Sequence, residues 1–283
     1  MSATETRLVR IGHSPDPDDA FMYYAIAKGK VDTAGFRVVQ VLEDIESLNR
    51  RALAGELEVT AISIHAYAHL TDRYALMSCG ASMGAGYGPI VVAREPFAPA
   101  ELGAKTIAIP GTLTSAYLAL RLYVGKEFRF VVVPFDRILD AVAAGEADAG
   151  LIIHEGQLTF AERGLSKIVD LGIWWGERTG GWPLPLGGNA VRKDLGPTAM
   201  SALTTMYRNS IAYALTHRAE ALSYAKDFGR GLDAATNDRF VGMYVNDLTL
   251  DYGERGRNSI RRFLDEGLAA GIVPPVGPVT FVA

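Results

Sequence analysis

The chain has 283 residues, of which 49% are hydrophobic and 21% are charged, a composition typical of a folded globular protein. Its 28 Lys and Arg residues against 32 Asp and Glu residues give a net charge of -4, which argues against a nucleic-acid partner. The single cysteine, Cys79, excludes an internal disulfide and a cysteine-rich zinc module, and its apolar neighbours favour a buried, unreactive thiol.

The start of the chain predicts neither a targeting segment nor a membrane segment. Met1–Arg10 is mostly polar and lacks the apolar core of a signal peptide. No window approaches the roughly 20 apolar residues that a membrane-spanning helix needs. The sequence therefore predicts a cytoplasmic protein with no membrane partner.

Strands and helices are expected to alternate from the first residues onward. Strands are predicted over 8–12, 36–42 and 59–64, and helices over 18–29 and 45–55. Asp44 is the expected N-cap of the second helix, which should end at Gly55. Such alternation is typical of α/β layers around a parallel or mixed sheet.

A similar unit recurs about 90 residues later. The pairs Gly55-Glu56 and Gly145-Glu146 are offset by 90, and each precedes a predicted strand. Residues 105–124 also repeat the strand–turn–helix plan of residues 7–29. All such units share some patterning, so chance similarity is an alternative, but the direct interpretation is two similar α/β lobes.

We expect lobe one to contain residues 1–93 with 192–283 returning to it, and lobe two to contain 94–191. Prolines break the chain at the first crossing, and Pro183–Arg192, which cannot be helical, makes the second. Helices are then predicted over 197–217, 218–228, 234–246 and 253–271. Two lobes joined in this way leave a cleft between them, where small ligands bind.

The turn after the predicted strand 105–110 opens a helix and is rich in hydroxyl groups. Gly111, Thr112, Thr114 and Ser115 place backbone N–H groups and hydroxyls where a carboxylate or phosphate can bind. The alternative is that one of these side chains only caps its own helix. The turn lacks the spacing of a nucleotide-binding P-loop, which disfavours a triphosphate.

Two histidines end corresponding strands. His154 follows an apolar strand and is a candidate base at the mouth of the cleft; the alternative is a histidine satisfied by the backbone. Glu155 should face the opposite way and is no obvious partner. His65 occupies the matching place in lobe one, with Ser63 on the same side of its strand. His65 and His69 are four residues apart, but no third ligand supports them, so we predict no metal site.

Two further segments each have two interpretations. In the loop 13–19, Ser14 and Asp16 could face the cleft, whereas Asp18 and Asp19 are expected to complement a helix dipole. The tryptophan-rich segment, with Trp174, Trp175 and Trp182, predicts either core packing at the crossing or an aromatic ring stacked on a planar ligand.

Taken together, these stretches resemble the 1,4-dihydroxy-6-naphthoate synthase family of menaquinone biosynthesis, over nearly the whole chain. The stretches that carry the resemblance are Ser14-Pro15 with Asp18-Asp19, Ser63-Ile64-His65-Ala66-Tyr67, Gly111-Thr112 with Thr114, Ile152-Ile153-His154-Glu155, Trp174-Trp175, and Pro183-Leu184-Pro185-Leu186-Gly187.

The resemblance implies a two-lobe, periplasmic-binding-protein-like type II fold that works as an enzyme. It implies a cofactor-free lyase of the futalosine pathway, which converts cyclic dehypoxanthine futalosine into 1,4-dihydroxy-6-naphthoate. His154 takes the position of the family's proposed base, and Ser63, Thr114 and Ser115 take pocket positions. The substrate carries a carboxylate, which suits the helix N-terminus at Thr114 and Ser115.

One departure affects the predicted substrate. Several family members have Cys-Pro-Asn-Asp where this chain has Asp16-Pro17-Asp18-Asp19. If Asp16 faced the cleft, its carboxylate would disfavour an anionic substrate. A chorismate dehydratase-like enzyme of the same pathway is therefore an alternative. A non-catalytic solute-binding protein, which would use the same two-lobe cleft without chemistry, is a second one. A homodimer is compatible with the sequence, which does not specify the oligomeric state.

Overall fold

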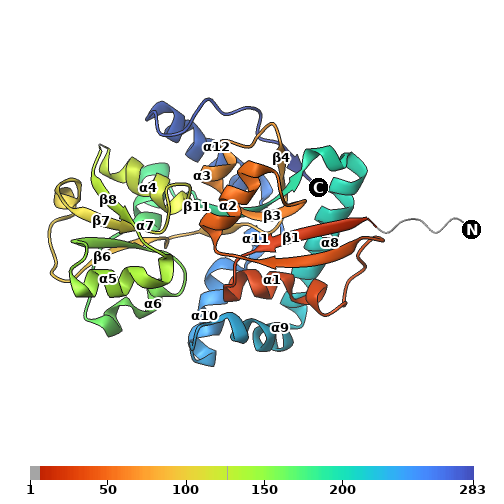
Figure 1. Ribbon diagram of the computed structural model, residues 1–283, viewed down its shortest axis with the longest axis horizontal. Helices are drawn as coiled ribbons and strands as arrows, with labels where there is room; N and C mark the ends of the chain where they lie inside the picture. Colours follow the sequence, from red (N-terminus) through yellow and green to blue (C-terminus); the bar gives the residue numbers. More distant parts are fainter. Residues whose placement is uncertain (1–6, 126) are drawn as a thin grey trace, which may run out of the picture.

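The computed structural model describes residues 7–125 and 127–283, which form two β-sheets flanked by helices (Figure 1). The residues 1–6 of the predicted polar start lie outside this range. The first sheet contains β1 (Leu8–His13), β2 (Arg37–Leu42), β3 (Val59–Ser63), β4 (Tyr74–Met77), β5 (Ser82–Gly84), β11 (Leu184–Arg192) and β12 (Phe281–Val282). The second sheet contains β6 (Ile90–Ala93), β7 (Thr106–Ile109), β8 (Arg129–Val132), β9 (Ala149–Ile152) and β10 (Ser166–Asp170).

Helices divide between the sheets, and together they define two lobes. The first lobe is the seven-stranded sheet with α1 (Pro17–Ala27), α2 (Ile45–Ala54), α3 (Ile64–Tyr67), α8 (Pro197–Thr216), α9 (Arg218–Ala225), α10 (Ala234–Tyr244), α11 (Asp247–Leu250) and α12 (Gly253–Ala269). The second lobe is the five-stranded sheet with α4 (Ser115–Val124), α5 (Ile138–Ala144), α6 (Gly156–Thr159) and α7 (Leu171–Thr179). Short 3₁₀ turns lie at Pro99–Ala104, Phe135–Arg137, Phe160–Arg163, Lys193–Leu195 and Lys226–Phe228.

The predicted strand–helix alternation is confirmed, and local chemistry accounts for the helix ends. The carboxylate of Asp44 accepts hydrogen bonds from the N–H groups of Glu46 and Ser47 at the start of α2. Gly55 ends that helix with a φ of 73°, a left-handed conformation that glycine adopts without a steric penalty. The four helices predicted after residue 196 are also present, as α8, α9, α10 and α12.

Both sheets have the same strand order, which confirms the internal repeat. The order is β2-β1-β3-β11-β4 in the first sheet and β8-β7-β9-β6-β10 in the second. In each sheet the first three strands are parallel and the fourth is antiparallel to its neighbour. The antiparallel strands, β6 and β11, are those that directly follow the crossings between the lobes, which Figure 1 shows as extended segments.

Strand pairing assigns β6 to the second sheet and β11 to the first. The lobe bounds expected from the sequence, 1–93 with 192–283 and 94–191, stay a prediction. No helix among the described residues is long and apolar enough to cross a membrane.

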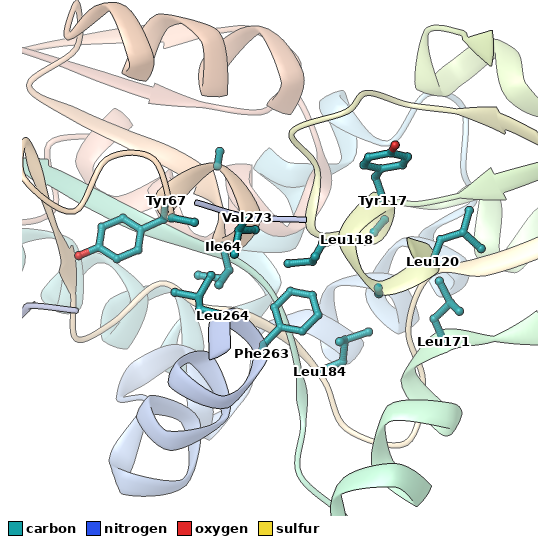
Figure 2. Packing of buried hydrophobic residues seen from close by; sticks show 14 of the residues in the cluster. Ile64, Tyr67, Tyr117, Leu118, Leu120, Leu171, Leu184, Phe263, Leu264 and Val273 are labelled. Carbon is teal, nitrogen blue, oxygen red and sulfur yellow. The ribbon is translucent and has the colours of Figure 1, made fainter. Parts of the chain in front are cut away.

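An apolar cluster joins the two lobes along one side. Figure 2 shows some of its members: Ile64 and Tyr67 of α3, Phe263 and Leu264 of α12, and Leu118 of α4. Trp175 belongs to the same cluster: it is fully buried, it packs edge-on against Phe263, and its indole N–H donates to the carbonyl of Pro183 at 3.1 Å. For Trp175, the structure therefore confirms the interpretation as core packing.

Two glycines in α7 provide a test of this packing. A Cβ at Gly172 would overlap the backbone carbonyl of Tyr87, whereas a Cβ at Gly176 would meet no described atom within 4 Å beyond its own helix backbone and adjacent residues. We expect Gly172→Ala to lower the free energy of unfolding by about 3 kcal/mol, because backbone atoms must shift to admit the methyl group. Gly176→Ala, the matched control, should raise it by about 0.5–1 kcal/mol, because alanine favours a helix interior. Urea unfolding measures both, and equal midpoints would contradict the packing described here.

Candidate active site

A cavity of about 100 Å³ lies between the lobes and takes residues from both of them. The first lobe contributes the loop before α1 and the first turn of α1, the start of α2, residues of β3, β5 and β11, and α10. The second lobe contributes the start of α4 and the segment after β9. Its polar and aromatic lining residues are Ser14, Asp18, Asp19, Ser63, Ser82, Thr114, Ser115, His154, Gln157, Phe240 and Tyr244.

The cavity brings together five of the seven residues proposed from the sequence. Ser14, Ser63, Thr114, Ser115 and His154 all line it. The remaining two, Gly111 and Thr112, are absent from its lining.

Gly111 instead lies against Glu46 of the first lobe. A Cβ at Gly111 would overlap the Glu46 carboxyl group, and that carboxyl accepts a hydrogen bond from the N–H of Leu113 at 3.2 Å. Burial raises the pKa of Glu46. This turn therefore holds a side chain of the opposite lobe, which explains why it contains glycine.

The start of α4 combines a helix cap with free backbone donors. The Thr114 hydroxyl accepts from the N–H of Tyr117 at 3.2 Å and donates to the carbonyl of Gly111 at 3.0 Å, so this side chain caps its own helix. The N–H groups of Ser115 and Ala116, in the first turn, have no carbonyl partner within the helix. Both residues line the cavity, where these N–H groups and the helix dipole favour an anionic group.

Buried polar contacts hold the side chains next to this helix end. The Ser63 hydroxyl accepts from the Asn49 amide at 3.0 Å, and the Ser115 hydroxyl accepts from the N–H of His65 at 3.2 Å. Burial lowers the pKa of His65 to about 4, so its ring is neutral at physiological pH and bonds to the Thr114 carbonyl at 3.2 Å. His65 thus positions the second-lobe helix against the first lobe.

His154 lies immediately after β9 and contacts the first lobe. Its Nδ1 is 3.1 Å from Oδ2 of Asp16, while its Nε2 is buried with no hydrogen-bond partner among the described residues. The ring packs edge-on against Phe135, with centroids 4.7 Å apart. The backbone φ of His154 is 57°, a left-handed conformation that costs of order 1–3 kcal/mol in a residue with a Cβ and that is typical of functional sites.

Asp16 is almost completely buried and does not line the cavity. Besides His154 it contacts Arg230, whose guanidinium lies 2.7 Å from Oδ1. Burial alone raises the pKa of Asp16, but the adjacent His154 ring and the Arg230 guanidinium outweigh burial and hold the pKa below its ordinary value. The carboxylate that departs from the family pattern is therefore neutralised by its neighbours and does not face the ligand space.

Arg230 completes a charged network across the lobes. It pairs with Glu155 at 2.9 Å, donates to the carbonyl of Pro15 at 3.1 Å, and stacks over the ring of Phe135 at 4.6 Å. Glu155 is expected to face away from the cleft only if the strand continues through it; the strand ends at Ile152, and Glu155 turns toward Arg230. Arg230 is not among the residues predicted from the sequence, where its only signal is an arginine between two glycines in a loop.

The fold defines the class of protein. Two α/β lobes with the same strand order are joined by two crossings and enclose a cavity, in the periplasmic-binding-protein-like type II fold predicted from the sequence. The alkanesulfonate-binding protein from Xanthomonas axonopodis pv. citri, solved with bound MOPS, has this fold with a TM-score of 0.73 at 15% identity, covering 99% of this chain and 100% of that one. That likeness concerns the fold alone.

Closer relatives give the family. Residues 9–268 match the family described as menaquinone biosynthesis, and the chain belongs to it. A protein from Thermus thermophilus named 1,4-dihydroxy-6-naphthoate synthase is 44% identical over 274 residues, or 97% of this chain and 99% of that relative. A protein of the same name from Streptomyces coelicolor is 38% identical, covering 95% and 96%. A solved structure from Archaeoglobus fulgidus is 47% identical with a TM-score of 0.90, covering 94% and 98%. These relatives support an enzyme of menaquinone biosynthesis.

Proposed function

We propose that this chain is a 1,4-dihydroxy-6-naphthoate synthase: a cytoplasmic, cofactor-free lyase that converts cyclic dehypoxanthine futalosine into 1,4-dihydroxy-6-naphthoate. The name of two relatives, each covered by more than nine-tenths of this chain, supports the reaction. The single structural observation that carries the proposal is the environment of the two ring nitrogens of His154. Its Nδ1 contacts a buried carboxylate, and its Nε2 has no hydrogen-bond partner within residues 7–125 and 127–283, in a side chain that lines the cavity.

In this proposal each group of the cavity has a defined task. The N–H groups of Ser115 and Ala116 bind the substrate carboxylate, and Ser63 lines the opposite wall. The Asp16 carboxylate favours the tautomer of His154 that carries its proton on Nδ1. Nε2 then has a free lone pair, and it removes a substrate proton to start the C–C or C–O bond cleavage. The closed lobes exclude water while this happens.

The test is to incubate the purified protein with cyclic dehypoxanthine futalosine and, in parallel, with chorismate, and to follow both by mass spectrometry. We expect 1,4-dihydroxy-6-naphthoate from the first substrate and no change in the second. Dehydration of chorismate would instead identify the related enzyme of the same pathway. Tight binding of cyclic dehypoxanthine futalosine without any product would identify a binding protein, and either result overturns the proposal.

A further inference from the structure

Three carboxyl groups lie together where β1 leads into α1, and all three are at least nine-tenths buried. They belong to Asp16, Asp18 and Asp19. Three buried carboxylates cannot all be ionised cheaply in one small volume, because like charges in a low-dielectric site repel one another. Their neighbours indicate which of them is charged.

Two of the three have clear stabilising partners for a negative charge. Asp16 contacts His154 and Arg230, as described above. Asp19 accepts hydrogen bonds through Oδ2 from the N–H of Ser14 at 2.9 Å and from its hydroxyl at 2.7 Å. The charge of Asp16 is therefore compensated by ion pairs, and Asp19 is held by two hydrogen bonds, although burial raises the pKa of Asp19 as well.

Asp18 has almost no such support. Its Oδ2 lies 3.4 Å from the hydroxyl of Ser82, and its Oδ1 is buried with no hydrogen-bond partner among the described residues. Its side chain lines the cavity, unlike that of Asp16. An unpartnered polar oxygen in a buried side chain that lines a ligand cavity indicates a hydrogen bond that a ligand completes.

The charged groups around Asp18 favour its neutral form. Asp16 and Asp19 face it from its own segment, Ser82 from β5, and Tyr244 from α10. Arg230 and His154 contact Asp16 instead, and His13 faces Asp19 with a pKa lowered by burial, so that the His13 ring is neutral. Burial first, and then the charges of Asp19 and Asp16, raise the pKa of Asp18 well above its ordinary value. The backbone N–H groups at the start of α1 oppose this shift but do not cancel it.

We propose that Asp18 carries its proton at neutral pH and donates a hydrogen bond to an oxygen atom of the substrate bound in this cavity. This inference rests on the proposed function and deepens it, because it concerns the same site. A neutral carboxyl group binds a carbonyl, hydroxyl or carboxylate oxygen, whereas an ionised Asp18 would repel the anionic substrate. It also gives the cavity a donor on the first lobe, in addition to the α4 N–H groups on the second.

The first test needs no substrate. The infrared difference spectrum between the wild-type protein and Asp18→Asn at neutral pH should contain the C=O band of a carboxylic acid, which is replaced by carboxylate bands at alkaline pH. Asp238→Asn, at an exposed carboxyl group on α10 that pairs with Arg218, is the matched control and should remove carboxylate bands only. Carboxylate bands at neutral pH in the Asp18 difference spectrum would overturn the proposal, even if the protein proves to have another substrate.

The second test separates donation from titration. At neutral pH we expect Asp18→Asn to lower kcat/KM about threefold, because an amide N–H still donates, and Asp18→Ala to lower it about tenfold or more, because the donor is gone. The wild-type rate should fall at alkaline pH as Asp18 ionises, and this fall should be absent in Asp18→Asn. Equal losses in the two folded variants, or an alkaline fall that persists in Asp18→Asn, would overturn the role of Asp18.

Discussion

Replacing His154 with glutamine is expected to lower kcat by about 10²- to 10⁴-fold, the usual contribution of a general base. Glutamine is similar in size and keeps a polar side chain, but its amide has no lone pair basic enough to remove a proton. The substrate carboxylate should still bind at the start of α4, so the dissociation constant of the substrate should change much less than kcat. Stopped assays by mass spectrometry and calorimetric titration measure the two quantities.

His217→Gln provides the control. His217 is exposed at the junction of α8 and α9, where its ring stacks on Tyr213, outside the cavity lining. This variant should keep wild-type turnover. A folded His154→Gln protein with near-normal turnover would rule out His154 as the base, and the search would move to the other titratable groups that line the cavity.

The fold was largely predictable from the sequence, because its signals are local. The cap at Asp44, the glycine at position 55 and the apolar spacing of α2 lie within about a dozen residues. The 90-residue offset between Gly55 and Gly145 likewise indicated a second copy of one unit, and each of these glycines adopts the left-handed conformation that ends its helix.

The site was predictable only in part, because its decisive contacts join distant segments. Ser14, Ser63 and His154 were predictable because each lies near the end of a strand that a periodic pattern reveals. The contact between Arg230 and Asp16 was not, since 214 positions separate the two and no periodicity relates a loop to a strand end. The proposed protonation of Asp18 was not predictable for the same reason, because it depends on burial and neighbouring charges that only the folded chain brings together.

The contact between Asp16 and His154 also links lobe closure to chemistry. Asp16 precedes α1 in the first lobe, whereas His154 follows β9 in the second, so the carboxylate reaches Nδ1 only when the lobes are as close as they are here. Arg230 strengthens the same closed arrangement by contacting Asp16 and Glu155 together. The base would thus be oriented at the moment that the cavity closes around the substrate.

Asp16→Asn is expected to lower kcat by about 10²-fold or more, although the substitution is nearly isosteric. The carboxylate can only accept a hydrogen bond from the Nδ1–H group, whereas an asparagine amide can donate one to Nδ1. Donation to Nδ1 moves the ring proton to Nε2, so the lone pair that should act as the base is lost; an Asp→Asn change beside a catalytic histidine has this effect in serine proteases. Nitrogen-15 chemical shifts of the His154 ring report which nitrogen carries the proton, and we expect it on Nδ1 in the wild-type protein and on Nε2 in the variant.

Arg230→Gln separates this orienting role from simple cohesion of the lobes. It removes the other partner of Asp16 but leaves the carboxylate next to Nδ1. We expect it to raise KM and to leave the tautomer of His154 unchanged. If Arg230→Gln and Asp16→Asn lower kcat equally, and neither moves the ring proton, Asp16 only holds the lobes together.

Stability should follow the charge of Asp16 as well. Because its pKa in the folded protein lies below the ordinary value, its ion pairs stabilise the folded state at neutral pH, and this contribution is lost as the pH falls below about 4. The difference in free energy of unfolding between wild type and Asp16→Asn should therefore be largest at neutral pH and shrink in acid. A difference that is constant from neutral to acid pH would mean that the buried carboxyl group is uncharged, and an uncharged Asp16 could not select the tautomer of His154.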